Sequence, residues 1–278
     1  MPELPEVECL ARALSPAMSG RKVTSIQFIR ADLRQPIPQD SIRQLLVNQE
    51  ILSVERRSKY LLIRCNTGAM ICHLGMTGRL LMFDSHLPQI SHTHAIFTLS
   101  KKGDLPNHLH FVDPRRFGLF DYLDASTPLT EHRLFNKLGP EPLEIKDLGQ
   151  WLWKKSRDRR QAIKPFLMTP EVVVGVGNIY ASEALFGARI HPSRPAQELS
   201  LKEFRALGSN VIQTLTGAIQ SGGTTFRDFT NSDGKPGYFS VSLKVYGRKG
   251  KPCTQCRNAV EATTHSGRST FYCAVCQK

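Results

Sequence analysis

The sequence predicts an α+β chain built from three parts: a β domain, a helical domain and a small cysteine module. Three observations predict this fold class. Short segments rich in β-branched and aromatic residues, separated by turn signals, follow the first twenty residues. From about Asp124 the apolar spacing becomes helical. The last part, from about Lys244, is short and basic and holds four of the seven cysteines.

One helix is expected before the strands. Its apolar residues recur at helical spacing, at Val7, Leu10, Leu14 and Met18. Pro5 suits the first turn of this helix, and Gly20 suits its end. The positive end of a helix dipole favours carboxylates, and three lie here, at Glu3, Glu6 and Glu8. The N-terminal segment therefore has the features of an ordered helix start.

The strand candidates come next along the chain. They are KVTSIQFIR, ILSVERRSKYLLIRC, GAMICHLG, RLLMFD, HAIFTLS, HLHFVD and FGLFDYL. Each is short and bounded by turn residues. This number of short strands at close spacing predicts a β-sandwich or a β-barrel, and the residues alone leave both open.

A linker and a helical region follow the strands. Pro128, Pro140 and Pro142 mark a linker-like stretch with LGPEPL at its centre. Helices are expected over WLWKKSRDRRQAIKPFLM, after VGVGN, and near LSLKEFRALGSNVIQTLTGAI. The predicted divisions are residues 1–130 for the β domain, 131–148 for the linker, 149–243 for the helical domain and 244–278 for the cysteine module.

The charge balance narrows the class of partner. Lys and Arg outnumber Asp and Glu by 37 to 24, which gives a net charge of +13. Such a balance suits a polyanion, although a protein that is merely basic remains the alternative until a site is found. No apolar stretch of about 18 residues is present, so no membrane-spanning helix is expected. The acidic N-terminus does not resemble a signal peptide, so a reducing cytoplasm is the expected location.

The cysteine spacing predicts a metal site. Cys253-x-x-Cys256 is followed, after sixteen residues, by Cys273-x-x-Cys276. Two such pairs fit one closed, tetrahedral zinc site with a structural role, whereas a redox pair would not need the second. The segment between the pairs is expected to form a β-hairpin with Arg268 near its tip. With Arg248, Lys249 and Lys251 upstream, the module favours phosphate binding over a merely solvated surface.

Further candidates lie at turns and strand ends. Gly175 and Gly177 precede a helix expected from Asn178, which indicates either an anion site or a plain helix cap. Lys59 and His73 are either strand ends facing solvent or phosphate contacts. Three residues on the turns HLGMTGR and DPRRFG are either core or a wedge between base steps: Met76, Arg115 and Phe117. SDGKPGYF is a loop able to cover a ligand, or an ordinary surface loop.

Taken together, these segments resemble the bacterial formamidopyrimidine-DNA glycosylases, which excise oxidised purines. The resemblance covers nearly the whole chain and rests on PELPEVE, RRSKYLL, HLGMTGR, DPRRFG, LGPEPL, AIKPFL, VVGVGNIYASE, GGTTFRDF, SDGKPGYF, KVYGRKG and the four-cysteine finger with TFYC. It implies an N-terminal β-sandwich with flanking helices, a helix–two-turn–helix domain and a zinc finger, with DNA in the cleft between them. The implied protein is a monomer that acts on double-stranded DNA.

The resemblance also implies residue roles. Once Met1 is removed, Pro2 supplies the amine nucleophile, and Glu3 beside it assists proton transfer, with Lys59 at the reacting site. Glu6 is implied as a second helping carboxylate and Lys164 as a lysine near the damaged nucleotide. The residues that grip phosphates are implied to be Lys59, His73, Asn178 and Arg268. Met76, Arg115 and Phe117 fill the gap in the duplex, and the loop over the flipped base contains Ser232, Gly234, Lys235, Gly237 and Tyr238.

The implied chemistry is base excision followed by β- and δ-elimination through a proline iminium. Two other functions stay open: an endonuclease VIII-like glycosylase for oxidised pyrimidines, and a non-catalytic zinc-finger DNA-binding protein. A third alternative, a zinc-bearing RNA-binding module, is disfavoured because the sequence contains no aromatic ribonucleoprotein strand motif. The chain departs from the family where Thr169-Pro170 replaces a common Asp; Thr followed by Pro can still begin a helix, so we expect a local change and no loss of activity. Cys9 replaces a common Thr and is expected to pack within the first helix; Cys65 and Cys72 are expected in the strand core.

Overall fold

The computed structural model describes residues 2–84, 90–222 and 243–278. These residues form two compact units, divided between Asn136 and Lys137, and the second unit includes the C-terminal segment. The loop Ser232–Phe239, expected to cover a ligand, lies outside the described residues. No helix of the described part has the length and apolar character that crossing a membrane requires.

The first helix, α1 (Leu4–Met18), forms as its sequence predicts. Pro5 lies in the first turn, and Glu3 and Glu6 form a capping box, in which each side chain accepts the backbone N–H of the other. The four predicted apolar residues are all buried. The helix ends where Ser19 N–H donates to the Ser15 carbonyl, and Gly20 follows at φ +76°, a conformation that favours glycine.

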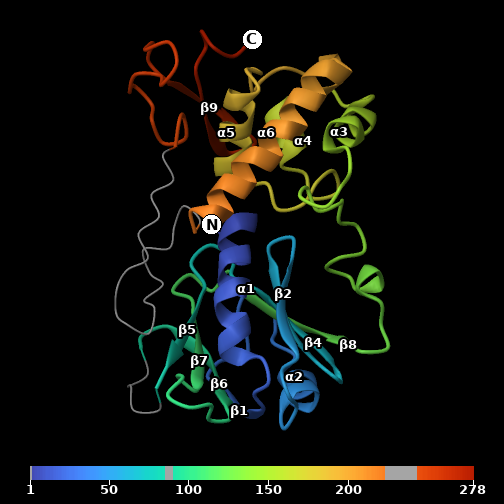
Figure 1. Cartoon of the computed structure of the whole chain (residues 1–278), viewed down its shortest axis with the longest axis vertical. Helices are drawn as coiled ribbons and strands as arrows, with labels where there is room; N and C mark the ends of the chain where they lie inside the picture. Colours follow the sequence, from blue (N-terminus) through green and yellow to red (C-terminus); the bar gives the residue numbers. More distant parts are fainter. Residues whose placement is uncertain (1, 85–89, 223–242) are drawn as a thin grey trace. The chain divides into compact units, whose positions relative to one another are not determined.

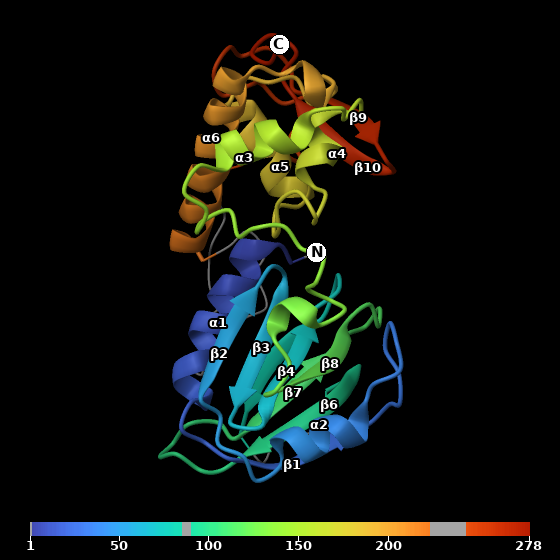
Figure 2. The ribbon, with the colours of Figure 1, turned by 90° about the vertical axis from the view of Figure 1, so that its right-hand side faces the viewer.

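Eight strands of the first unit form two antiparallel sheets (Figures 1 and 2). The first sheet has the order β1-β6-β7-β5, with bounds Val23–Phe28, Thr93–Leu99, His108–Val112 and Arg79–Phe83. The second has the order β2-β3-β4-β8, with bounds Ser53–Arg57, Tyr60–Cys65, Gly68–His73 and Leu119–Asp124. One buried cluster takes side chains from both sheets, which makes the unit a β-sandwich.

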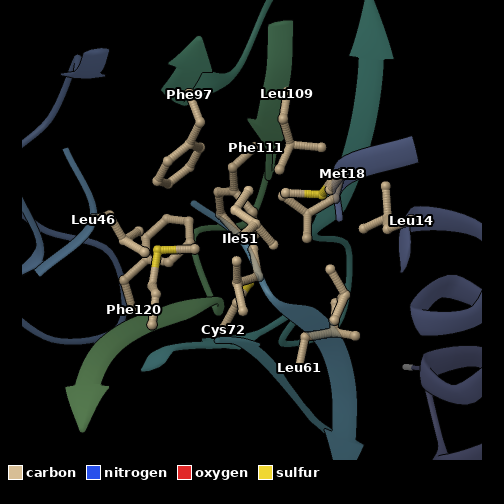
Figure 3. Close-up of a cluster of buried hydrophobic side chains, with 14 of the residues drawn as sticks. Leu14, Met18, Leu46, Ile51, Leu61, Cys72, Phe97, Leu109, Phe111 and Phe120 are labelled. Atoms are coloured by element: carbon tan, nitrogen blue, oxygen red, sulfur yellow. The ribbon is translucent and has the colours of Figure 1, made fainter. Parts of the chain in front are cut away.

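The core of the sandwich is shown in Figure 3. Phe97, Phe111 and Leu109 come from the first sheet, and Leu61 and Cys72 from the second. The apolar face of α1 joins the same cluster. The Phe111 and Phe120 rings meet edge-on with centroids 4.7 Å apart, an arrangement that aromatic pairs prefer. Cys65 and Cys72 are buried, which confirms the expectation that both are strand core.

Two local features of this unit were not predicted. The candidate strand ILSVERRSKYLLIRC is a hairpin, because Arg57 pairs with Tyr60 and the chain reverses at Ser58-Lys59, where Ser58 has φ +57°. A short helix, α2 (Gln39–Leu46), also lies among the strands. It buries Ile42, Leu45 and Leu46 and packs against β1, β4 and β8.

The N-terminal part of the second unit is helical. Its helices are α3 (Leu148–Ser156), α4 (Ile163–Leu167), α5 (Asn178–Gly187) and α6 (Leu201–Gln220), and a 3₁₀ turn, η2 (Ala196–Glu198), lies in a connection. Another 3₁₀ turn, η1 (Leu129–Glu131), lies near the end of the first unit. The single helix predicted over residues 151–168 was wrong. It is broken after Ser156, and Asp158 takes a left-handed φ of +64°. The predicted helices after VGVGN and near residues 199–219 are confirmed.

Thr169-Pro170 does not begin a helix, although Thr followed by Pro is compatible with one. These residues follow the end of α4 and form a turn, in which Thr169 Oγ1 donates to the Pro165 carbonyl and Val172 N–H donates to the Thr169 carbonyl. The Pro170 carbonyl accepts the N–H of Gly139. The polar groups of this turn therefore form hydrogen bonds with neighbouring segments, and no helix starts from it.

The chain closes with a hairpin of β9 (Glu261–His265) and β10 (Arg268–Tyr272). Ser266 and Gly267 form its two-residue turn, with φ of +49° and +72°. Arg268 is the first residue after this turn and is exposed. The predicted hairpin, with Arg268 near its tip, is confirmed.

Candidate functional site

The start of α1, directly after Pro2, is held by reciprocal hydrogen bonds. Glu3 N–H donates to Glu6 Oε2 at 2.9 Å, and the Glu3 side chain accepts the Glu6 N–H in return. Both carboxylates are at most 2% exposed, whereas Pro2 is partly exposed. Glu6 thus fixes the backbone of Glu3, and through it the direction in which the chain enters at Pro2.

The turn that carries Lys59 is tied to the same helix. Arg56 Nε donates to Glu8 Oε2 at 2.8 Å, and Arg56 Nη1 donates to the Ser58 carbonyl at 3.1 Å. Burial alone would raise the pKa of Glu8, but hydrogen bonds from Arg56 and Arg12 outweigh it and leave that pKa below its usual value. A charged Glu8 therefore holds the β2–β3 turn, including Lys59, against α1.

His73 is a neutral hydrogen-bond donor at the end of β4. Its Nδ1 accepts the N–H of Gly75 at 2.9 Å, so the single proton of the neutral ring lies on Nε2. Its ring contacts Tyr60, with centroids 4.8 Å apart. Burial, reinforced by the positive charges of Lys59 and Arg34, lowers the pKa of His73 to about 4. At neutral pH this imidazole therefore offers an Nε2–H group and no positive charge.

This protonation state gives a testable pH dependence. If His73 donates Nε2–H to a DNA phosphate, His73→Ala should weaken DNA binding about 10-fold, the value of one hydrogen bond to a charged group. The ratio of the variant and wild-type Kd should stay constant from about pH 6 to 9, because the donor is the neutral ring. Fluorescence anisotropy across that range measures it. A ratio that shrinks above pH 7 would mean that a protonated imidazole makes the contact.

The predicted wedge residues lie on two loops that are joined to each other. Met76 and Phe117 are 42% and 41% exposed, and the guanidinium of Arg115 stacks on the Phe117 ring at 4.8 Å. A side chain at Gly75 would come within 2.3 Å of the Phe117 backbone, so only glycine permits this close approach. The three residues are therefore surface groups presented together, and the alternative that they are core is wrong.

Asp113 is the residue that joins these loops. It is fully buried, and its two carboxylate oxygens accept from Thr77 Oγ1 and from Gly118 N–H. Thr77 Oγ1 in turn accepts the N–H of Arg115. Asp113 is the first residue of the DPRRFG motif, but the sequence alone assigned it no role. A buried carboxylate between two loops is visible only when both are placed in space.

Lys164 connects separate segments of the second unit through hydrogen bonds, and we call this group of contacts the hub. Its side chain is 1% exposed, and Nζ donates to Asn178 Oδ1 at 2.6 Å, the Ser269 carbonyl at 2.9 Å and Thr270 Oγ1 at 2.9 Å. Three acceptors match the three protons of an ammonium group. One lysine thereby joins the first residue of α5 to the hairpin strand that begins at Arg268.

An open pocket of about 340 Å³ lies beside this hub. Lys164, His265 and Arg268 line it, together with Thr169 and Pro170, where the chain departs from the common family pattern. His265 bridges the hub to a neighbouring loop, because its Nδ1 lies 2.9 Å from Thr270 Oγ1 and its Nε2 lies 3.0 Å from Ser193 Oγ. Burial, with the nearby charge of Lys164, lowers the pKa of His265.

Because Lys164 contacts the strand that begins at Arg268, we expect substitutions of Lys164 and Arg268 to have coupled effects on DNA binding. Arg268→Ala should lower the salt slope of binding by about one if Arg268 contacts a phosphate. Lys164→Met should weaken binding 10- to 100-fold, about 1.4–2.8 kcal/mol, because it leaves Asn178 and the Arg268 strand unheld. The double variant should lose less than the sum of the two, by about 1 kcal/mol. Additive losses would mean that Lys164 acts independently of the hairpin.

The four predicted cysteines converge. The Sγ atoms of Cys253, Cys256, Cys273 and Cys276 all lie within 4.8 Å of one another. Two of the separations are 3.9 Å and 3.4 Å. A tetrahedral Zn²⁺ with sulfur ligands at 2.3 Å requires separations of about 3.8 Å. The residues therefore fit a zinc ion, which would bind to four thiolates.

The cysteine module is joined to α5 and to the segment after it by two side chains that sequence reasoning missed. Glu183 is buried and accepts three consecutive backbone N–H groups, from Lys244, Val245 and Tyr246. Gln277 accepts the N–H of Cys273 and donates to the Ile190 carbonyl. Their signal in the sequence is weak, because a Glu within NIYASEALF and a Gln near a chain end are ordinary surface residues elsewhere.

The predicted site residues thus fall into two groups. The first unit holds Pro2, Glu3, Glu6, Lys59, His73, Met76, Arg115 and Phe117. The second holds Lys164, Asn178, Arg268 and the four cysteines. Five further candidates belong to the loop outside the described residues: Ser232, Gly234, Lys235, Gly237 and Tyr238.

Comparison with known proteins identifies the family in which this arrangement of domains occurs. Three family models match in order: the formamidopyrimidine-DNA glycosylase N-terminal domain over residues 1–120, the H2TH domain of the same glycosylases over residues 138–230, and the zinc finger found in FPG and IleRS over residues 250–278. The formamidopyrimidine-DNA glycosylase of Magnetococcus marinus is 45% identical over 278 residues, the whole of both chains. The chain belongs to the formamidopyrimidine-DNA glycosylase family. The glycosylase of that name from Escherichia coli is also 45% identical over 278 residues, with both chains fully covered.

Solved structures of formamidopyrimidine-DNA glycosylases share the fold. A variant of the Lactococcus lactis protein, in complex with DNA containing Fapy-dG, has a TM-score of 0.89 at 29% identity, with both chains fully covered. The Thermus thermophilus protein has a TM-score of 0.84 at 35% identity, covering 99% of this chain and 98% of its own. The predicted family and fold class are confirmed: the chain is a DNA glycosylase with a β-sandwich, an H2TH domain and a four-cysteine finger.

Proposed function

We propose that this glycosylase excises oxidised purines, including 8-oxoguanine and formamidopyrimidines, from duplex DNA and then cuts the strand as an AP lyase, with the amine of Pro2 as nucleophile. The observation that carries the proposal is the reciprocal Glu3–Glu6 cap, which orders the backbone next to Pro2 and buries both carboxylates. The cap holds the residue after Pro2 in one conformation, which would keep the Pro2 nitrogen in a defined position for attack. The Fapy-dG and abasic-site DNA held by the Lactococcus lactis relatives support the same substrate class.

The covalent step follows from amine chemistry. After Met1 is removed, the Pro2 nitrogen is a secondary amine with a pKa of about 8 in model compounds, so an appreciable neutral fraction exists at pH 7. Its lone pair attacks C1′ of the extruded nucleotide, the C1′–N bond breaks, and the base leaves with a proton. The C1′–O4′ bond then breaks as O4′ takes a proton, which Glu3, one residue away, would carry, and the ring-opened sugar remains bound to nitrogen as an iminium.

The iminium formed next drives strand cleavage. Because a proline nitrogen in an iminium has no proton to lose, its positive charge persists and acidifies the C2′–H bond. Loss of that proton expels the 3′ phosphate, and a second elimination expels the 5′ phosphate. Water then hydrolyses the iminium, releases the unsaturated sugar fragment as an aldehyde and restores the amine. No step requires an external oxidant or reductant.

The other residues support binding in this proposal. Lys59, His73, Asn178 and Arg268 donate to phosphates around the damaged nucleotide, and Met76, Arg115 and Phe117 fill the space left by the extruded base. The loop with Ser232, Gly234, Lys235, Gly237 and Tyr238 covers that base. One zinc ion, with a structural role, holds the hairpin that carries Arg268. The enzyme works as a monomer on DNA in the cytoplasm.

The substrate class is tested by excision under single-turnover conditions. Duplexes containing 8-oxoguanine should be cut at least about 10-fold faster than duplexes containing thymine glycol, a difference of about 1.4 kcal/mol in transition-state binding. Borohydride should trap a protein–DNA adduct, and peptide mapping should place it on the N-terminal residue. Preference for thymine glycol would support an enzyme for oxidised pyrimidines, and binding with no adduct would support a non-catalytic DNA-binding protein.

A further inference from the structure

A strongly basic surface covers the last turn of α3 and the residues after it, outside the site described above. We call Lys154, Lys155, Arg157, Arg159 and Arg160 the α3 basic surface. All five are exposed, and Asp158 is the one acidic residue among positions 154–160. Among the described residues, none of the five has a carboxylate within ion-pair distance. Their positive charge is therefore available to an external anion.

Two of these cations are held in fixed positions by tryptophan rings. Lys155 Nζ lies 4.7 Å from the centre of the Trp151 ring, and the Arg157 guanidinium lies 5.2 Å from that of Trp153. Trp151 is itself fixed, because its Nε1–H donates to the Val172 carbonyl at 2.7 Å. Arg157 also donates to the Leu199 carbonyl. Side chains that are already ordered lose less entropy when they bind a ligand.

The α3 basic surface continues directly into the pocket beside Arg268. Gln161, the residue after Arg160, lines that pocket together with Lys164 and Arg268. The connecting backbone is held in place, because Gln197 N–H donates to the Arg159 carbonyl and Ala196 N–H donates to the Gln161 carbonyl. One residue spans at most about 3.5 Å, so Arg159 and Arg160 lie within about 7 Å of Gln161 along the chain.

We propose that the α3 basic surface binds the phosphate backbone of duplex DNA beyond the segment held around the lesion. The proposal rests on the proposed function, since it takes Arg268 to contact DNA next to the pocket. Duplex DNA carries one phosphate charge per about 1.7 Å of its axis, so a strand gripped near Arg268 continues past the neighbouring cations. These contacts are with phosphates, so they are independent of base sequence and of damage.

The first test varies duplex length. Two double variants, Lys154→Gln/Lys155→Gln and Arg159→Gln/Arg160→Gln, are titrated with lesion-centred duplexes of about 12 and 30 base pairs at several salt concentrations. On the long duplex each variant should lower the salt slope by about 2 and weaken binding about 10-fold near 0.1 M salt. The Kd for the short duplex divided by the Kd for the long duplex should therefore be smaller in each variant than in the wild type. An unchanged ratio would overturn the proposal.

A matched control removes the same charge elsewhere. Lys101 and Lys102 are adjacent exposed lysines on the β6–β7 connection. They lie at the opposite end of β6 from Thr93, which pairs with Val112 beside the 113–118 loop. Lys101→Gln/Lys102→Gln should therefore leave the ratio of the two Kd values as it is in the wild type. A fall equal to that of the α3 variants would show a general charge effect and would overturn the proposal.

The second test uses the tryptophans as a built-in probe. Trp151 and Trp153 are the only two tryptophans of the chain, and a ring–cation contact involves each. The long undamaged duplex should change tryptophan emission, and the short duplex should change it much less. Equal emission changes would contradict the proposal. Borohydride trapping on the short lesion duplex reports the proposed chemistry separately, so failure of the one is distinguishable from failure of the other.

Discussion

Replacing Pro2 by glycine should lower the yield of borohydride-trapped adduct on 8-oxoguanine duplex by about 100-fold or more, a loss of about 3 kcal/mol of transition-state stabilisation. Glycine still offers an amine, but its imine can lose the proton on nitrogen and become neutral. The neutral imine is a weaker electron sink for elimination. Glycine also removes the pyrrolidine ring, which prevents rotation about the N–Cα bond and so fixes the direction of the nitrogen lone pair.

A one-residue extension before Pro2 tests the same assignment without altering the proline. It turns the nitrogen into an amide, whose lone pair is delocalised and cannot attack. Adduct formation should fall to background, while the Kd for lesion duplex should change by no more than about 3-fold. Mass spectrometry of each sample establishes its first residue. Adducts at the wild-type level in the extended protein would exclude Pro2 as the nucleophile.

Glu3→Gln separates proton transfer from position. Gln keeps an oxygen that accepts the Glu6 N–H, so the cap of α1 is preserved. We therefore expect the amine to stay in place while base release slows. Pro2→Gly and Glu3→Gln together distinguish a chemical role of this terminus from a purely structural role of the helix cap.

The sequence predicts those elements whose signal is local. The α1 helix, the hairpin near Arg268 and the zinc ligands are encoded by spacing within a few residues, and the structure places them as expected. The break after Ser156 was missed because WLWKKSRDRRQAIKPFLM contains no glycine and only one late proline. A left-handed Asp158 is tolerated there because the segment packs against the chain near Gln197.

The contacts that assemble the site are long-range and leave little trace in the sequence. Lys164 is 14 residues from Asn178 and 105 from Ser269, yet it bonds to both. Sequence reasoning placed Lys164 near the damaged nucleotide, which stays a prediction; the structure shows its side chain buried and hydrogen-bonded within the protein. A motif shows that a lysine is present, but its partners depend on how α4, α5 and the hairpin pack.

The second large effect concerns the cysteine cluster. Cys273→Ala should abolish tight zinc binding and weaken DNA binding by about 100-fold or more, because zinc binding would supply most of the free energy that folds the hairpin carrying Arg268. Its buried core is small: Val245, Cys253, Val260 and Cys273, packed on Phe186 of α5. Two of these residues, Cys253 and Cys273, are themselves predicted zinc ligands. Zinc binding to such modules is worth about 10–16 kcal/mol, far more than that core supplies.

The matched control is Cys72→Ala, which removes a fully buried thiol from the sandwich core and leaves the cluster intact. It should release one zinc per chain to a chromogenic chelator after denaturation, as the wild type should, and bind DNA as the wild type does. Cys273→Ala should release none. Its unfolding should still show the sandwich transition, because Cys273 lies in the second unit and the sandwich has a core of its own. Full DNA affinity without zinc would mean that Lys164, Glu183 and Gln277 alone suffice to dock the hairpin, and that the ion is dispensable for binding.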